Sequence, residues 1–332
     1  MKKLLSILFI VIIVISSFVL FGSAANYTWK LSHARTIGED LDNDANWFAN
    51  QLKEKTNGRI NIDVFPNHQL GDYTVVQELV SMGDVEIGFI CLSTSRDKRL
   101  MIQALPYTVS NWGEVPKVYG RESALKSIVE ELLEQQNIKY LCCWPFDFGG
   151  IGLIKKPLSP ADPDIPKNIK IRVPPMKQYE LCAEALGYIP TPIPWTEAYT
   201  SIQSGIVDGI IGAGAEVYYL NFRDILKYYL PLNDHFEVHY LYMNLDLWNS
   251  LSEEDQKIIL DLAIELENNR FVTAEEREKA CFQRLVDFGM EVIPFTNEEL
   301  AGFAKKVRET VWAELREDIG PELIDKILAD LE

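Results

Sequence analysis

Apolar and polar residues alternate in two short segments of the N-terminal third of the chain, and a third segment is mostly apolar. Such segments predict strands, whereas the apolar residues between them recur at helical spacing. The order strand, helix, strand, helix, strand is typical of a largely parallel sheet covered by helices. The predicted strands are residues 27–31, 60–65 and 85–92, and the predicted helices are residues 43–55 and 74–82.

The same patterns continue through the middle of the chain, with proline-rich loops between the elements. Residues 139–144 and 170–173 are predicted strands, and residues 119–135 and 176–186 are predicted helices. Residues 156–166 hold four prolines and predict a loop. The predicted fold class is therefore α/β.

One helical segment is much longer than the others. Ser252 suits an N-cap, acidic residues follow it, and nothing interrupts the pattern before Gly289. About 36 helical residues would span roughly 54 Å, which exceeds the size of one lobe. We therefore expect two lobes, with this helix running along both.

A separate pattern occupies the first 25 residues. Lys2 and Lys3 precede an almost unbroken apolar run at residues 4–21, and small residues follow at 22–25. This order is typical of a cleaved export signal. The alternative is an uncleaved anchor that spans the membrane. With either one, residue 26 and those after it would lie outside the cytoplasm.

Charge narrows the range of partners. The 332 residues carry a formal net charge of −17, and without Lys2 and Lys3 the charge is 30 minus 49, or −19. This excess of acid disfavours nucleic acid and anionic membrane surfaces as partners. An anionic ligand would have to be held by local cations and dipoles.

No residue pattern supports catalysis or cofactor binding. The five cysteines are irregularly spaced, and buried free thiols are favoured over a disulfide. His235 and His239 are four residues apart, but the sequence offers no third metal ligand nearby. The glycines of residues 209–214 lack the lysine of a phosphate-binding loop. We therefore expect no enzymatic activity, no metal and no cofactor.

Arg172 and Trp195 are the residues best placed by the sequence to hold a ligand. Arg172 ends a predicted strand just before two prolines, and the carboxyl ends of parallel strands face the crevice where α/β proteins bind ligands. A guanidinium can donate two parallel hydrogen bonds to a carboxylate. Trp195 precedes a helix and could form an apolar wall. The alternatives are a salt bridge for Arg172 and a core position for Trp195.

Between Lys170 and Gly209 the chain resembles the solute-binding proteins of TRAP transporters, the DctP-type family. The shared pattern is Lys-x-Arg-x-Pro, then Pro-Thr-Pro, then an aromatic residue with Glu and Tyr, then Gln-x-Gly-x-Val-Asp-Gly. Further family landmarks occur in the family's order and extend the resemblance over almost the whole chain after the signal. They are residues 57–60, 65–71, 104–107 and 248–252.

The resemblance implies two α/β lobes, joined by crossing strands and a long helix, that close over a ligand. One lobe would comprise residues 26–148 plus about 237–276, and the other residues 149–236 plus about 277–332. The resemblance also implies that Arg172 binds a carboxylate and that Trp195 packs against the ligand. The candidate ligand-binding residues are Arg172, Trp195, Gly212, Phe148, His33, Ser93, Tyr73 and Glu216.

The partners implied by the resemblance are a small organic acid and the small and large membrane subunits of a TRAP transporter. The implied location is extracytoplasmic. Three other functions remain open from the sequence: a binding protein for an ABC importer, an exported enzyme acting on a carboxylate, and a binding protein coupled to a sensor.

Two departures from the family pattern bear on the ligand. Family members often have Glu-Asn-Pro after the Asp-Gly, whereas residues 211–213 are Ile-Gly-Ala, so an amide contact is missing. Many members carry another arginine in the strand before the proline-rich loop, whereas residues 144–154 contain none. We therefore expect that a second charge contact is absent.

These departures predict a monocarboxylate with an apolar body, aromatic or branched. Gly212 and Gly214 would leave room for that body, and Trp195 and Phe148 would flank it. A dicarboxylate or a sugar acid is the alternative.

Overall fold

The computed structural model describes residues 26–331, so the predicted export signal lies outside the described residues. None of the helices in the described part combines the length and the apolar composition that crossing a bilayer requires.

The first sheet combines the N-terminal strands with two strands from later in the chain. β1 (Tyr27–Ser32) lies between β2 (Ile60–Phe65) and β3 (Ile87–Ile90) and runs parallel to both. β9 (Phe236–Asn244) pairs antiparallel with β3 and with β4 (Ile138–Leu153). The alternation of strand and helix over residues 27–90 therefore forms the parallel sheet that its sequence pattern predicts.

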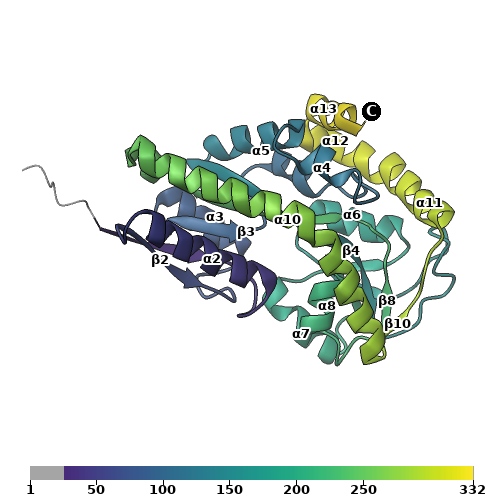
Figure 1. The fold of residues 1–332 in the computed structure, drawn as a ribbon. Coiled ribbons are helices and arrows are strands. Elements are labelled where there is room, and N and C mark those ends of the chain that lie inside the picture. Colours follow the sequence, from purple (N-terminus) through teal and green to yellow (C-terminus); the bar gives the residue numbers. More distant parts are fainter. Residues whose placement is uncertain (1–25, 332) are drawn as a thin grey trace, which may run out of the picture.

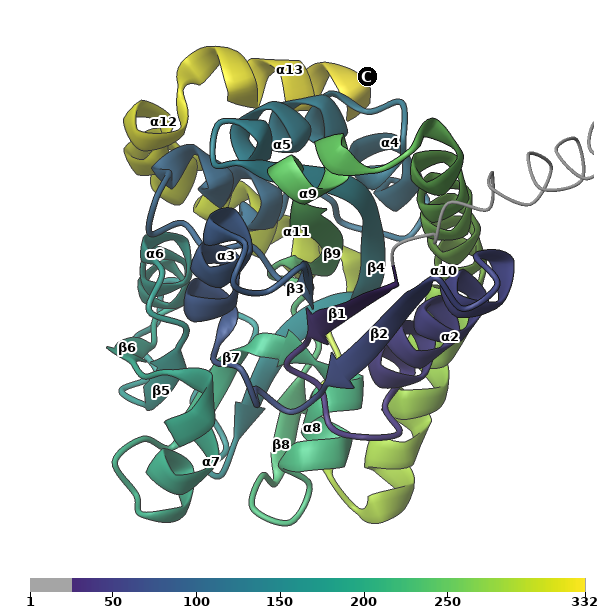
Figure 2. The same ribbon diagram turned by 90° about the vertical axis from the view of Figure 1, so that its left-hand side faces the viewer.

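Helices cover this sheet on both faces, and Figure 2 shows the strands β1 to β3 between α3 on one side and α2 on the other. The helix predicted at residues 119–135 begins only at Ala124, because α4 ends at Tyr119, the chain turns at Gly120, and Ser123 caps the new start by accepting a hydrogen bond from Lys126 N. The helices are α2 (Asp40–Lys55), α3 (Tyr73–Met82), η1 (Lys98–Ala104), α4 (Val115–Tyr119), α5 (Ala124–Glu134) and α9 (Leu245–Ser250).

The second sheet is built from the middle of the chain. β5 (Lys170–Val173) lies between β6 (Ile189–Pro192) and β7 (Gly209–Gly214), parallel to both. The end of β4 pairs antiparallel with β7 and with β8 (Tyr228–Leu230), and β10 (Glu291–Val292) pairs parallel with β8. The helices of this half are α6 (Lys177–Ala185), α7 (Trp195–Gln203) and α8 (Ala215–Asn221).

β4 is a strand of 16 residues that belongs to both sheets. Residues up to Phe148 pair with β9, whereas Gly149 to Leu153 pair with β7 and β8. The register shifts between Pro145 and Phe148, as expected where proline has no N–H for the ladder. The sequence predicts this strand only at residues 139–144, because proline and glycine usually interrupt strands.

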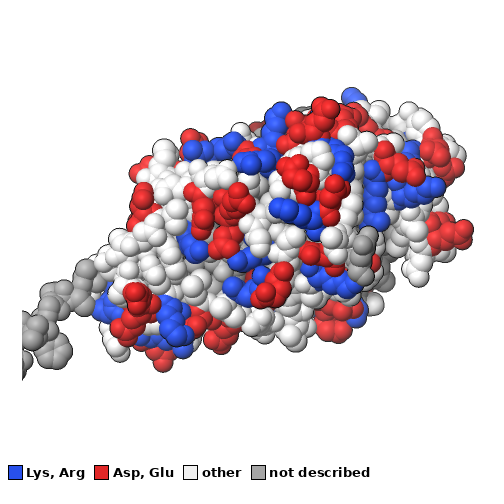
Figure 3. Space-filling view, turned by 90° about the horizontal axis from the view of Figure 1, so that it is seen from above, with Lys and Arg blue, Asp and Glu red and all other residues white. Residues whose placement is uncertain are grey.

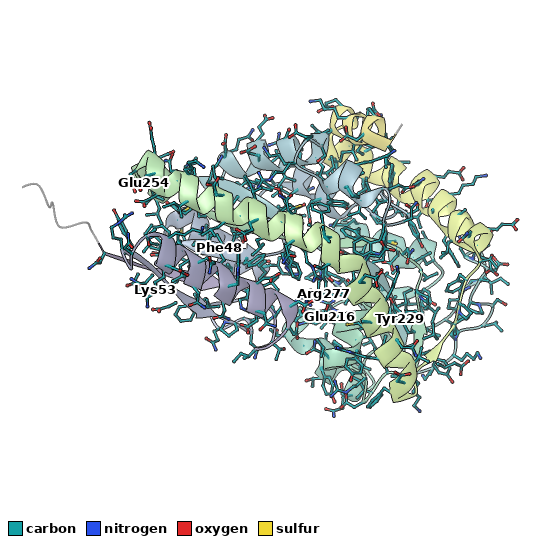
Figure 4. The ribbon with its side chains drawn as sticks, in the orientation of Figure 1. Phe48, Lys53, Glu216, Tyr229, Glu254 and Arg277 are labelled. Atoms are coloured by element: carbon teal, nitrogen blue, oxygen red, sulfur yellow. The ribbon has the colours of Figure 1, made fainter. Side chains whose placement is uncertain are left out.

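α10 (Glu253–Phe288) is the long helix that the sequence predicts, and its 36 residues contact elements of both sheets. Figure 1 shows it running from the side of α2 to the side of α8. Ser252 caps its start, and Gly289 ends it with a φ of 104°. In Figure 4, Phe48 of α2 lies beside its first half, and Glu216 of α8 lies beside Arg277 in its second half.

Two buried charged side chains bind α10 to β4. Arg270 donates a hydrogen bond to the carbonyl oxygen of Pro145 at 2.7 Å and lies 4.0 Å from the ring centroid of Trp144. Glu267 accepts a hydrogen bond from the backbone N–H of Cys143 at 3.0 Å. The helix is therefore fixed to the strand that crosses from one sheet to the other.

The C-terminal helices contact helices of both sheets. α11 and η2 contact α6, whereas α12 contacts η1 and α13 contacts α4 and α5. The division into lobes at about residues 149, 237 and 277 stays a prediction. These helices are α11 (Asn297–Val307), η2 (Arg308–Trp312), α12 (Ala313–Ile319) and α13 (Pro321–Leu331).

Candidate ligand-binding site

A cleft of about 950 Å³, including the space that opens to solvent, lies between the two sheets. The first half of the molecule lines it with Arg35, Glu39, His68, Tyr73 and Cys91. The second half lines it with Arg172, Met176, Tyr179, Trp195 and Gly212. The start of β9 contributes Phe236, Glu237 and His239. A ligand in this cleft would therefore contact both halves and a strand that joins them.

Arg172 projects into the cleft from near the carboxyl end of β5 and is only 2% exposed. Its Nε donates to the carbonyl oxygen of Ile193 at 2.8 Å, and one terminal nitrogen donates to the carbonyl oxygen of Ile211 at 3.4 Å. These bonds hold the plane of the guanidinium and leave its other N–H groups for a ligand. No carboxylate of residues 26–331 forms an ion pair with it.

The charge of Arg172 persists despite its burial. Burial lowers its pKa to about 10, because water no longer stabilises the cation. The guanidinium remains protonated at neutral pH. The cleft thus contains a buried cation without an anionic partner in the described part of the chain.

Trp195 and Gly212 shape the space around Arg172. The guanidinium carbon lies 5.4 Å from the ring centroid of Trp195, which packs edge-on against Phe222. Gly212 has a φ of 96°, and a Cβ there would lie 2.7 Å from Pro174 Cγ. Glycine therefore lets β7 approach the turn after β5 closely, beside the arginine.

Arg35 is a second arginine in the cleft lining, outside the segment in which the sequence interpretation sought one. It lies just after β1, at the carboxyl end of a parallel strand. Its guanidinium forms an ion pair with Glu237 and donates to His239 Nε2 at 2.9 Å. The sequence interpretation considered only residues 144–154 for this role, although Arg35 meets the same positional rule as Arg172.

Arg35 and Glu237 stabilise each other's charged forms. Burial lowers the pKa of Arg35, but the carboxylates of Glu237 and Glu39 outweigh this effect and raise it. Burial raises the pKa of Glu237, but the adjacent Arg35 outweighs this effect and brings it to about 2. Both groups are therefore charged at neutral pH, and the charge of Arg35 is already compensated.

Two further polar groups of the first half line the cleft, and the sequence interpretation missed both. Glu39 is 7% exposed, and its Oε2 atom is buried without a hydrogen bond from the described residues. Both ring nitrogens of His68 are buried in the same way. Burial and the nearby Arg35 lower the pKa of His68, so its ring is neutral at pH 7.

Four of the candidate residues lie outside the cleft lining. Phe148 packs between Trp112 and Phe236 in the core. His33 is fully buried against Asp42, at 3.2 Å. The other two are Ser93, whose N–H donates to Gln77, and Glu216, which is buried on α8.

Gly214 also lies outside the cleft lining. A Cβ there would meet Asp147 Oδ2 at 2.2 Å, so this glycine serves internal packing rather than space for a ligand. Arg172, Trp195, Gly212 and Tyr73 are the candidate residues that the fold brings together.

The paired histidines do not form a metal centre. His235 directly precedes β9 and its Nδ1 contacts Asp234 at 2.6 Å, whereas His239 lies within β9 and contacts Glu237 at 3.1 Å. Over residues 26–331, no three His, Cys, Asp or Glu side chains gather as a metal site would require.

Comparison with protein families identifies the family of this chain. Residues 31–318 match the family of bacterial extracellular solute-binding proteins, family 7, known as DctP. The chain belongs to this family. It is a solute-binding protein of the TRAP type, and the family is one of binding proteins rather than enzymes.

Relatives in this family cover most of the chain. The C4-dicarboxylate-binding periplasmic protein DctP of Rhodobacter capsulatus is 27% identical over 90% of each chain. The sialic acid-binding periplasmic protein SiaP of Vibrio cholerae is 24% identical over 91% of this chain and 92% of its own. The fold matches that of the sugar acid binding protein DctPAm of Advenella mimigardefordensis, in complex with galactonate, with a TM-score of 0.84 and 19% identity over 92% and 98% of the two chains.

Proposed function

We propose that this TRAP-type protein captures a small organic acid outside the cytoplasm and delivers it to the membrane subunits of a TRAP transporter. Arg172 carries the proposal, because it is a buried cation without an anionic partner among the described residues. Burying a charge unpaired costs several kcal/mol, and a ligand carboxylate would remove that cost. The planar guanidinium also orients a carboxylate through two parallel hydrogen bonds.

The negative charge of the ligand must be compensated by groups inside the cleft, because the protein as a whole is acidic. Figure 3 shows acidic and basic side chains interspersed over one face of the molecule. The formal net charge of −17 would repel an anion at long range. A specific cation inside the cleft is therefore the physical basis for binding an acid.

A monocarboxylate with an apolar body suits this cleft better than a dicarboxylate. Arg172 is the cleft arginine with a free charge, since Glu237 already compensates Arg35. The walls include apolar and aromatic side chains that would pack on such a body. They are Tyr73, Met176, Tyr179, Trp195 and Phe236.

Delivery would depend on closure of the two halves over the acid. Hinge closure requires a ligand that binds the closed state better than the open one, and a ligand that contacts both sides of the cleft meets this condition. β4, β9 and α10 connect the two sheets and would bend or pivot during closure. The family resemblance supports docking of the closed form onto the membrane subunits.

Calorimetric titration with a panel of acids tests the proposal. We expect tighter binding of 4-methyl-2-oxopentanoate and phenylpyruvate than of succinate and galactonate. If succinate or galactonate binds more tightly, the proposed apolar monocarboxylate is wrong, although acid binding stands. If no organic acid binds at all, whether or not it carries an amine, the proposed function itself is wrong.

A further inference from the structure

Buried polar atoms without hydrogen-bond partners gather at the Arg35 side of the cleft, where the acceptors Glu39 Oε2 and Glu237 Oε2 occur with the donor Arg35 Nε. Glu39 lies at the N-cap of α2, yet its side chain makes no capping hydrogen bond. It is 7% exposed, its Oε2 is buried without a donor, and no cation of residues 26–331 forms an ion pair with it. A carboxylate this deeply buried ordinarily has a partner.

Glu237, on β9, also has a carboxylate oxygen that lacks a hydrogen-bond donor. Its Oε1 contacts both Arg35 and His239, whereas its Oε2 is buried without a hydrogen bond from the described residues. Glu237 forms an ion pair with Arg35, and Glu39 follows Arg35 by four residues in the chain. Both also line the cleft.

The charges that line the cleft cancel before a ligand binds. Arg35 and Arg172 are cations, and Glu39 and Glu237 are the acidic residues of the lining. Burial lowers the pKa of His68 and of His239, so both rings are neutral at pH 7. A ligand with one carboxylate alone would leave the enclosed cleft with a net negative charge. A ligand that is itself neutral overall would not.

We propose that the ligand is a zwitterion, with its carboxylate on Arg172 and a protonated amine that donates to Glu39 and Glu237. This inference rests on the proposed function and deepens it. An ammonium group has three N–H donors and a positive charge, so it can serve both carboxylates, whereas a hydroxyl has one donor. The apolar body of the ligand lies between the two ends, against Trp195 and Phe236.

Matched pairs of acids, with and without an amine, test the inference by calorimetric titration of the full-length protein at pH 7. The pairs are L-phenylalanine and 3-phenylpropanoate, 4-aminobutanoate and butanoate, and 6-aminohexanoate and hexanoate. The series varies the separation of the two charges. For at least one pair we expect the amine to lower the Kd at least tenfold.

A variant of Glu39 then tests whether the affinity gained from the amine depends on this carboxylate. Glu39→Gln keeps the shape of the side chain but removes its charge, so the advantage of the amine should fall below threefold. Glu265→Gln, on the exposed face of α10, is the matched control and should keep the full advantage.

Two outcomes would count against the inference, and they are distinguishable. If the acids bind but the amine gives no advantage in any pair, the zwitterion is wrong and acid binding stands. If no member of the panel binds, both the zwitterion and the proposed function are overturned.

Discussion

Arg172 and Arg35 occupy equivalent positions in the two halves of the molecule, and they differ in what surrounds them. Each lies at or near the carboxyl end of a strand in a parallel pair, each is at most 7% exposed, and each packs over an aromatic ring. Arg35 has an internal carboxylate partner, whereas Arg172 donates only to backbone carbonyl groups. Position and burial therefore make an arginine a candidate, and the absence of an internal counter-ion makes it available to a ligand.

The largest effect should follow removal of the paired arginine. Arg35→Ala leaves Glu237 buried without its counter-ion. Removing one partner of a buried pair costs about 3–5 kcal/mol, so the free energy of unfolding should fall by that amount. Urea unfolding followed by circular dichroism measures the change.

The double variant Arg35→Met with Glu237→Leu is the control for this prediction. It removes both charges together, and it should be within about 1 kcal/mol of the original stability or exceed it. If the single variant is as stable as the original protein, the pair is not the source of stability that we describe.

Removal of the unpaired arginine should affect binding rather than stability. Arg172→Ala abolishes two charge-assisted hydrogen bonds to the ligand, so the affinity should fall by roughly 3 kcal/mol, or more than 100-fold in Kd. The fold should persist, because no internal carboxylate loses a partner. Calorimetry measures the affinity, and a thermal melt measures the stability.

Arg316→Ala supplies the matched control, since Arg316 is paired with Asp325 on the surface of the C-terminal helices. This variant should change neither the affinity for the ligand nor the thermal stability appreciably. An Arg172→Ala variant that binds as tightly as the original protein would remove Arg172 from the site.

A buried carboxylate that forms no ion pair with the described residues should make stability depend on pH. Burial raises the pKa of Glu216 to about 7, with Asp40 adding to the shift and Arg270 and Arg35 opposing it. A raised pKa favours the folded state below the unfolded value, near 4.5, and this stability is lost as the pH rises through 7. The loss is at most on the order of 3 kcal/mol, since one pKa unit corresponds to about 1.4 kcal/mol.

Glu216→Gln tests this contribution. The variant should gain stability relative to the original protein at pH 8 and lose that gain at pH 5, as measured by urea unfolding at both values. An equal difference at the two pH values would show that Glu216 does not titrate in this range.

The smallest effect should come from the ring beside Arg172. Trp195→Leu keeps an apolar side chain but removes the cation–π contact at 5.4 Å, which is worth roughly 1 kcal/mol or about a fivefold rise in Kd. Tyr199→Phe is the control on the same helix, since its hydroxyl binds Asp224 away from the cleft lining. An unchanged Kd for Trp195→Leu would show that the ring does not contribute to binding.

The sequence predicts the elements and one side of the site well, because both depend on local patterns. The period of apolar residues identifies β1, β2, β3, β5 and α10 but not β6, β7 or β9, and the position of Arg172 before two prolines marks it as a cleft residue. The same rule would have found Arg35 after β1. The family motifs instead place a second arginine in the strand before the proline-rich loop, at residues 144–154.

The rest of the site depends on contacts between distant parts of the chain. Glu237 neutralises Arg35 across 202 residues of sequence, so no local pattern could show that this second cation is compensated. Phe148 reads as a ligand wall from the sequence, yet the register shift in β4 directs it into the core against Trp112. Such outcomes follow from strand pairing and register rather than from composition.

The place of β9 also constrains how the chain can reach its native state. β9 enters the first sheet between β3 and β4, so the edge of β3 stays open until residues 236–244 have been synthesised. The N-terminal strands therefore cannot complete their sheet early, and pairing of such distant segments is slow. We expect slow refolding in which neither half forms a stable intermediate alone.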